Sequence, residues 1–71
     1  MSQLGQNIKI LREMRKLTKQ ELALKIQVGT HVVEKYESGE KVPDLLALLR
    51  LSNVLEIPAS ELYTSGTVPY V

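Results

Sequence analysis

The stretch KQELALKIQVGTHVVEKYESG, which runs from Lys19 to Gly39, decides the fold of this 71-residue chain. Its apolar residues recur at helical spacing on both sides of the segment QVG, which interrupts the pattern. The spacing therefore predicts two short helices joined by a tight turn. The second helix, over residues 30–38, also carries a mixed polar face, which comprises Thr30, His31, Glu34, Lys35 and Ser38.

The apolar positions of this stretch predict how the two helices contact each other. Counted from Lys19, the small residue Ala23 is the fifth, where it lets a crossing helix approach closely. Val28 is the tenth and fills the turn, while Val33 and Tyr36 are the fifteenth and eighteenth and pack back onto the first helix. The outer face of the second helix then stays bare. Such a helix fits the major groove of B-DNA, whose base edges need side-chain donors and acceptors.

Further helices are predicted on both sides of this pair. Apolar residues at helical spacing indicate a helix over residues 4–14, and Thr18 with Glu21 forms a capping box at the start of the next helix. Gly39 can end the helix over residues 30–38 in a left-handed conformation. No segment before the tail has a convincing strand pattern. We therefore predict an all-α fold with one domain over residues 4–63 and a tail over residues 64–71.

The C-terminal half of the domain is predicted to contain two helices. Pro43 and Asp44 start a helix over about residues 45–55, and the segment 57–63, IPASELY, forms a short last helix. The main apolar face of the longer helix is expected to comprise Leu45, Leu48, Leu49, Leu51 and Leu55. Leu46 and Val54 fall off that face.

Composition and charge exclude several classes of function. The chain has no Cys, and His31 has no second His to complete a metal site. Its longest apolar run, residues 45–49, is too short to span a bilayer, and its N-terminus lacks the apolar core of a signal peptide. No pair of carboxylates, glycine-rich phosphate loop or Ser/His/Asp arrangement indicates an enzyme. We expect a cytoplasmic protein without cofactor, metal or small-molecule ligand.

The net charge of +1 is unevenly divided along the chain. Residues 1–39 hold seven basic and four acidic residues, an excess of three positive charges. Residues 40–71 hold two basic and four acidic residues, an excess of two negative charges. This division agrees with a polyanionic partner for the N-terminal half.

Over residues 4–63 the sequence resembles the Cro/C1-type (Xre family) helix-turn-helix domain of phage and bacterial transcription regulators. The resemblance is carried by LGQNIKILREMRKLTKQELA, by VGTHVVEKYESGEKVP and by LLRLSNVLEIPASELY. It implies a compact five-helix bundle of the lambda-repressor-like DNA-binding type, in which residues 30–38 form the recognition helix. Two positions depart from the family pattern, namely Gln27, where the family often has Gly, and Gly29, where Ser or Thr is expected.

The resemblance also implies roles for individual residues. Thr30, His31 and Lys35 match base-reading positions, and Val32 can contact a thymine methyl group. Candidate phosphate contacts are Lys19, Gln20, Ser38 and Lys41. Arg12 and Glu37 match a structural pair that ties the first helix to the recognition helix.

The function implied is that of a sequence-specific double-stranded DNA-binding transcription regulator, a repressor by resemblance. One short helix reads few base pairs, so we expect a two-fold homodimer on paired half-sites. The dimer surface is expected in the C-terminal part, from Leu46, Val54, Leu62 and Tyr63, with Ile57 and the tail residues Val68, Tyr70 and Val71 as further candidates. Two alternatives stay open: an antitoxin or immunity regulator with a protein partner, and a helical protein-interaction module without DNA binding.

Overall fold

The computed structural model describes residues 3–63, which form five α-helices. These are α1 (Gln3–Met14), α2 (Lys19–Ile26), α3 (Thr30–Ser38), α4 (Leu45–Leu55) and α5 (Ala59–Tyr63). No strand occurs within residues 3–63, and the predicted all-α, five-helix fold is confirmed. None of these helices has the length and apolar character needed to cross a membrane. The predicted tail, 64–71, lies outside the described residues.

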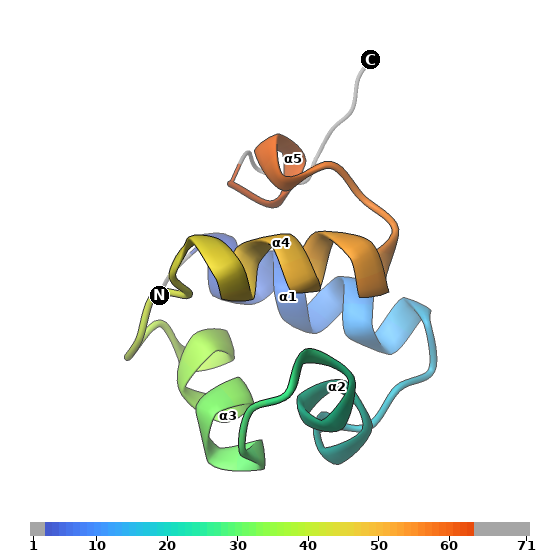
Figure 1. Ribbon diagram of the computed structural model, residues 1–71, viewed down its shortest axis with the longest axis vertical. Helices are drawn as coiled ribbons and strands as arrows, with labels where there is room; N and C mark the ends of the chain where they lie inside the picture. The colour runs from blue at the N-terminus through green and yellow to red at the C-terminus, as the bar shows by residue number, and fades with distance from the viewer. Residues whose placement is uncertain (1–2, 64–71) are drawn as a thin grey trace.

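The helices α2 and α3 lie together at one end of the molecule, and α5 lies at the opposite end (Figure 1). Between them, α1 contacts α3, α4 and α5, while α2 contacts α3 and α4. All five helices contribute to one core, whose fully buried side chains are Ile8, Leu22, Ile26, Val33, Leu51, Leu55 and Leu62. The pair α2–α3 therefore packs on α1 and α4, with α3 against α1 and α2 against α4.

Local hydrogen bonds fix where the helices begin and end. The Thr18 hydroxyl accepts from the Glu21 amide at 3.0 Å, and the Glu21 carboxylate accepts from the Thr18 amide at 2.8 Å. This is the predicted capping box, which satisfies two amides at the start of α2. The Asp44 carboxylate accepts from the Ala47 amide at 2.9 Å and begins α4, while Gly39 ends α3 at a φ of 88°.

A long-range hydrogen bond joins the first helix to the last. The side-chain amide of Asn7, which is buried in α1, donates to the Leu62 carbonyl at 2.9 Å. Asn7 also accepts from the Gln3 side chain at 3.1 Å. A buried amide of this kind must be hydrogen-bonded to avoid a large desolvation cost, so the bond fixes α5 against α1.

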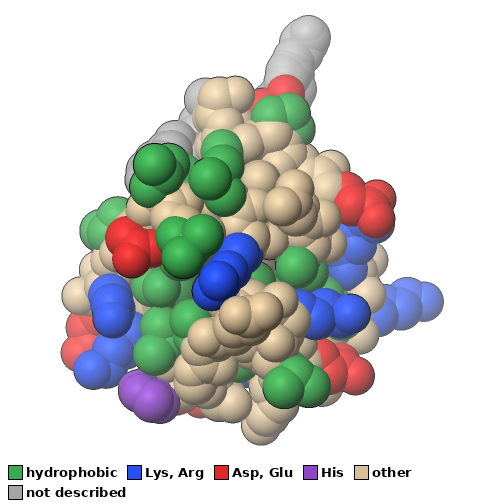
Figure 2. Space-filling model, viewed as in Figure 1, with side chains coloured by type: hydrophobic (Ala, Val, Ile, Leu, Met, Phe, Trp, Pro, Cys, Tyr) green, Lys and Arg blue, Asp and Glu red, His purple; other side chains and the backbone are tan. Residues whose placement is uncertain are grey.

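The apolar face predicted for α4 is wrong at two positions. Leu45 and Leu49 are 72% and 46% exposed, whereas Ala47 and Leu48 are buried. The sequence LLALLRLSNVL is apolar around most of its circumference, so periodicity alone does not decide which side faces the core. A strip of exposed apolar residues results, here called the α4 strip: Val42, Leu45, Leu46 and Leu49. Figure 2 shows hydrophobic side chains gathered over α4.

Candidate nucleic-acid interface

The inner face of α3 is held by apolar contacts, as the sequence predicted. Val33 and Tyr36 are buried against α1 and α2, and Ala23 of α2 is buried as well. Val28 is half-buried in the turn, and its amide donates to the Ala23 carbonyl at 3.0 Å. Burial, together with the negative charge of Asp44, raises the pKa of the Tyr36 phenol. The neutral aromatic side chain therefore belongs to the core and is not a stacking platform for a base.

A glycine sets the distance between α1 and α3. A Cβ atom at Gly5 would lie 2.5 Å from the Tyr36 carbonyl oxygen and 2.6 Å from the Glu37 carbonyl oxygen. These separations are much shorter than van der Waals contact, so only glycine allows α1 to approach the α3 backbone this closely. We did not predict this role from the sequence. The available signal was a glycine inside a helical pattern, which often has a packing reason.

The predicted pair of Arg12 and Glu37 is present in the interior. The Arg12 Nε donates to Glu37 Oε2 at 2.6 Å, and Nη2 donates to Oε1 at 3.3 Å. The guanidinium also donates to the Leu17 carbonyl at 2.8 Å through Nη1. The two side chains are only 8% and 6% exposed. This bidentate arrangement fixes the α3 backbone relative to α1 and to the loop before α2.

The turn between α2 and α3 contains both departures from the family pattern. Gln27 has a φ of 64°, a left-handed conformation that strains any residue other than glycine. Gly29 is the N-cap of α3, and no side chain caps the helix there. A Cβ atom at Gly29 would lie 2.7 Å from Cε1 and 2.9 Å from Nδ1 of His31, whose ring covers this position. Neither departure moves the start of α3, which begins at Thr30.

The outer face of α3 presents most of the predicted base-reading residues. His31 and Lys35 are exposed one helical turn apart, and Thr30 is half-buried beside them. Val32 is also half-buried but packs against the core, so it lies at the edge of this face. The structure therefore brings Thr30, His31 and Lys35 onto one surface and turns Val32 partly away from it.

The predicted phosphate contacts lie at the start of α2 and around the C-terminal end of α3. Lys19 and Gln20 are in the first turn of α2, where backbone amides point outward along the helix axis. Lys41 is exposed in the loop after α3, and its amide donates to the Lys35 carbonyl at 3.2 Å. The Ser38 hydroxyl donates to the same carbonyl at 3.1 Å. Because its single proton is used there, Ser38 must break a hydrogen bond before it can donate to a phosphate.

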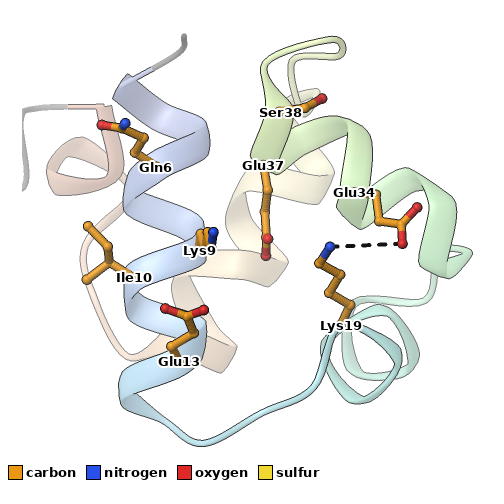
Figure 3. A pocket seen from close by; sticks show the side chains of 8 residues that line it. All are labelled: Gln6, Lys9, Ile10, Glu13, Lys19, Glu34, Glu37 and Ser38. Carbon is orange, nitrogen blue, oxygen red and sulfur yellow. Dashed lines mark ion pairs between the residues drawn. The ribbon is translucent and has the colours of Figure 1, made fainter.

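An open groove runs between α1 and α3 beside this surface (Figure 3). Lys9, Ile10 and Glu13 line it from α1, and Glu34 lines it from α3. At the end of the groove, Lys19 Nζ lies 4.0 Å from Glu34 Oε2, which joins the start of α2 to α3. The sequence predicts Glu34 on the polar face of α3 but gives no signal for this ion pair.

The sequence profile of the helix-turn-helix family matches residues 8–62, which is most of the chain. The chain belongs to this family. The predicted resemblance to Cro/C1-type domains is thereby confirmed, and the matched residues include α2, α3 and the turn between them.

Known proteins resemble this helix-turn-helix domain in sequence and in structure. The uncharacterized HTH-type transcriptional regulator YqaE of Bacillus subtilis is 35% identical over 53 residues, which are 75% of this chain. The match covers 46% of YqaE, so it spans about half the length of that relative. The restriction-modification controller protein C.AhdI from Aeromonas hydrophila superposes with a TM-score of 0.81 at 28% identity, over 86% of this chain and 92% of its own.

The P22 c2 repressor, solved in complex with a synthetic operator, superposes with a TM-score of 0.84. The superposition covers 87% of this chain and 94% of the P22 chain, and the two sequences are 24% identical. At this identity the likeness concerns the fold alone.

The residues predicted for a dimer surface differ widely in how exposed they are in the structure. Leu46 is 55% exposed, whereas Val54 is half-buried and packs against the core. Leu62 is 0% exposed because its side chain points from α5 into the core, where α5 packs on α1 and α4. The prediction that it contacts a second chain is therefore wrong. Ile57 is half-buried against the core as well. The side chain of Tyr63 and the tail residues Val68, Tyr70 and Val71 lie outside the described residues.

Proposed function

We propose that this helix-turn-helix domain is a sequence-specific double-stranded DNA-binding transcription regulator that acts as a repressor. The observation that carries the proposal is the contrast across α3. Its inner face is fixed by Val33, Tyr36 and the Arg12–Glu37 pair, while its outer face presents exposed polar side chains. A rigid helix with a free polar face is what readout in the major groove requires. The likeness to YqaE, an uncharacterized HTH-type transcriptional regulator, supports the proposal. The P22 protein shows that the same fold occurs in a repressor bound to an operator.

In this function α3 enters the major groove with its outer face toward the base edges. Lys35 donates to O6 and N7 of a guanine, and Thr30 and His31 donate to or accept from neighbouring bases. Lys19, Gln20 and Lys41 contact phosphates on the two sides of the groove, with Ser38 as a weaker contact. Val32 reaches a thymine methyl group only at the edge of the interface.

The repressor acts as a two-fold dimer, and the α4 strip is the surface that joins the two copies. One α3 helix reads too few base pairs to distinguish an operator from the rest of a genome, which favours two half-sites. The strip starts at Val42, in the loop that follows α3, so a second copy seated there lies beside the recognition helix. The bound dimer blocks polymerase by occupying its site.

Selection of duplexes from a random DNA pool tests the proposal, followed by titration of the selected operator at several salt concentrations. We expect a two-fold-symmetric motif and an affinity that falls steeply as salt rises. Lys35→Ala relaxes one position of the motif, while Lys19→Ala weakens all sequences and lowers the salt slope by about 1. Lys25→Ala, which removes an exposed charge from the other end of α2, is the control and leaves the motif unchanged.

The same titration measures the stoichiometry of the complex. We expect two copies per operator, with half-sites about one helical turn apart. Leu46→Asp in the α4 strip abolishes the two-copy complex, whereas Leu24→Asp, on the exposed side of α2, retains it. If no sequence is enriched and the variants bind DNA like the wild type, the domain is instead a protein-interaction module or a regulator that needs a protein partner.

A further inference from the structure

Glu34 is a negative charge on the face of α3 that the proposed function turns toward DNA. It lies one helical turn after Thr30 and one turn before Ser38, and its side chain is 56% exposed. In contrast, Glu37 on the same helix is buried and bound to Arg12. An exposed carboxylate opposes the approach of phosphates unless it finds a hydrogen-bond donor at the interface.

The fold itself does not require this carboxylate. Its observed partner is Lys19, whose Nζ lies 4.0 Å away across the end of the groove between α1 and α3 (Figure 3). The Lys19 side chain is 41% exposed, and an ion pair at such exposure contributes little to folding stability. Lys19 is also a proposed phosphate contact, so a phosphate can take its ammonium group and leave Glu34 to find another partner.

The chemistry of the major groove limits which base can be that partner. Guanine presents two acceptors there, O6 and N7, and thymine presents the O4 acceptor and a methyl group. Adenine presents the N6 amino donor beside the N7 acceptor, which repels a carboxylate oxygen. Cytosine presents the N4 amino donor without a neighbouring acceptor on the same base. A carboxylate on the reading face therefore fits cytosine best.

We propose that Glu34 is a specificity-determining residue that accepts a hydrogen bond from the N4 amino group of a cytosine in each half-site. Lys19 moves from the carboxylate to an adjacent phosphate when the complex forms. This inference rests on the proposed function and adds to it the identity of one base. At any other base the carboxylate faces an acceptor or lacks a good donor, so affinity falls.

The experiment replaces each base pair of the selected half-site in turn and measures the affinity of the wild type, Glu34→Gln and Glu34→Ala. We expect one position where the wild type prefers cytosine by about 5- to 150-fold. Glu34→Gln shifts the preference at that position to adenine, since an amide pairs with both N6 and N7. Glu34→Ala removes the preference there and leaves the other positions unchanged.

Glu13→Gln is the matched control, because Glu13 lines the same groove from α1 and the substitution removes the same charge. It changes the affinity for all sequences by one common factor and shifts no preference. Circular dichroism of each variant verifies that the helices remain folded.

Two outcomes overturn the inference, and they are distinguishable. If the wild type selects no duplex, the proposed function fails and this inference fails with it. If an operator is selected but Glu34→Gln strengthens binding to every sequence equally, Glu34 only repels phosphates. In that case the cytosine contact is wrong while the proposed function stands.

Discussion

The two carboxylates of α3 lie three residues apart and are held in opposite ways. Glu37 is buried and receives two hydrogen bonds from Arg12, whereas Glu34 is exposed and faces Lys19 at 4.0 Å. The first pair joins α3 to α1, and the second joins it to the start of α2. Under the proposed function, the comparison teaches that a helix that contacts bases needs a backbone that cannot shift and side chains that can change partners. Variants that break the buried pair test the first requirement through stability, and variants that break the exposed pair test the second through DNA affinity.

Arg12→Met is expected to cause the largest loss of stability. It leaves the buried Glu37 carboxylate without its partner and also removes the donor to the Leu17 carbonyl. Loss of one member of a buried pair costs about 3–5 kcal/mol in the free energy of unfolding, which urea denaturation measures. The double variant Arg12→Met with Glu37→Leu recovers part of this loss, since no charge is then buried alone. A loss below about 1 kcal/mol for the single variant would contradict a structural role for the pair.

Gly5→Ala tests how tightly α1 is set against the same part of α3. Alanine normally stabilises a helix relative to glycine by up to about 1 kcal/mol. Here its Cβ would meet two carbonyl oxygens of α3, so we expect a net destabilisation of about 1–3 kcal/mol. Thermal and urea unfolding measure it, and Lys9→Ala on the exposed side of α1 is the control. A stabilised Gly5→Ala protein would mean that α1 can move away from α3 at no cost.

The exposed pair is expected to give the smallest effect on stability. Lys19→Met and Glu34→Gln each change the free energy of unfolding by less than about 0.5 kcal/mol, and the double variant reveals a coupling of at most about 1 kcal/mol. The same variants are expected to alter DNA affinity strongly. A coupling as large as that of the buried pair would instead make Glu34 part of the structural brace and weaken its assignment to a base.

Structural features that depend on a few neighbouring residues could be predicted from the sequence. The Thr18–Glu21 capping box, the Asp44 cap and the left-handed Gly39 fixed the helix boundaries, because each depends on atoms within about one turn. The contact between α2 and α3 was also predictable, since the short turn leaves few ways to pair their apolar faces. The Arg12–Glu37 pair came from family resemblance, as the two residues are 25 positions apart.

Features that depend on distant neighbours were missed. The orientation of α4 was wrong because nearly every side of LLALLRLSNVL is apolar, and only the positions of α1, α2 and α5 decide which leucines are buried. The assignment of Leu62 to a dimer surface was wrong because α5 packs on α1 and α4, and the approach of α1, far away in the sequence, has no local signal. The Asn7–Leu62 bond likewise has no local signal, and the glycine at position 5 signals a close approach without indicating which helix approaches. Of the candidate interface, the outward placement of His31 and Lys35 on α3 could be predicted, whereas the Lys19–Glu34 pair required the structure.

The hydrogen bond from Asn7 to Leu62 has a consequence for the order in which the domain assembles. Its two ends are separated by 55 positions, so closing it restricts nearly the whole chain at once. With five residues, α5 cannot be stable as an isolated helix and forms only on surfaces that α1 and α4 already provide. The contacts of α3 with α2 join residues that are close in sequence, so they close much shorter loops than the Asn7–Leu62 bond does. The end that holds α5 therefore depends on long-range closure more than the end that holds α2 and α3 does.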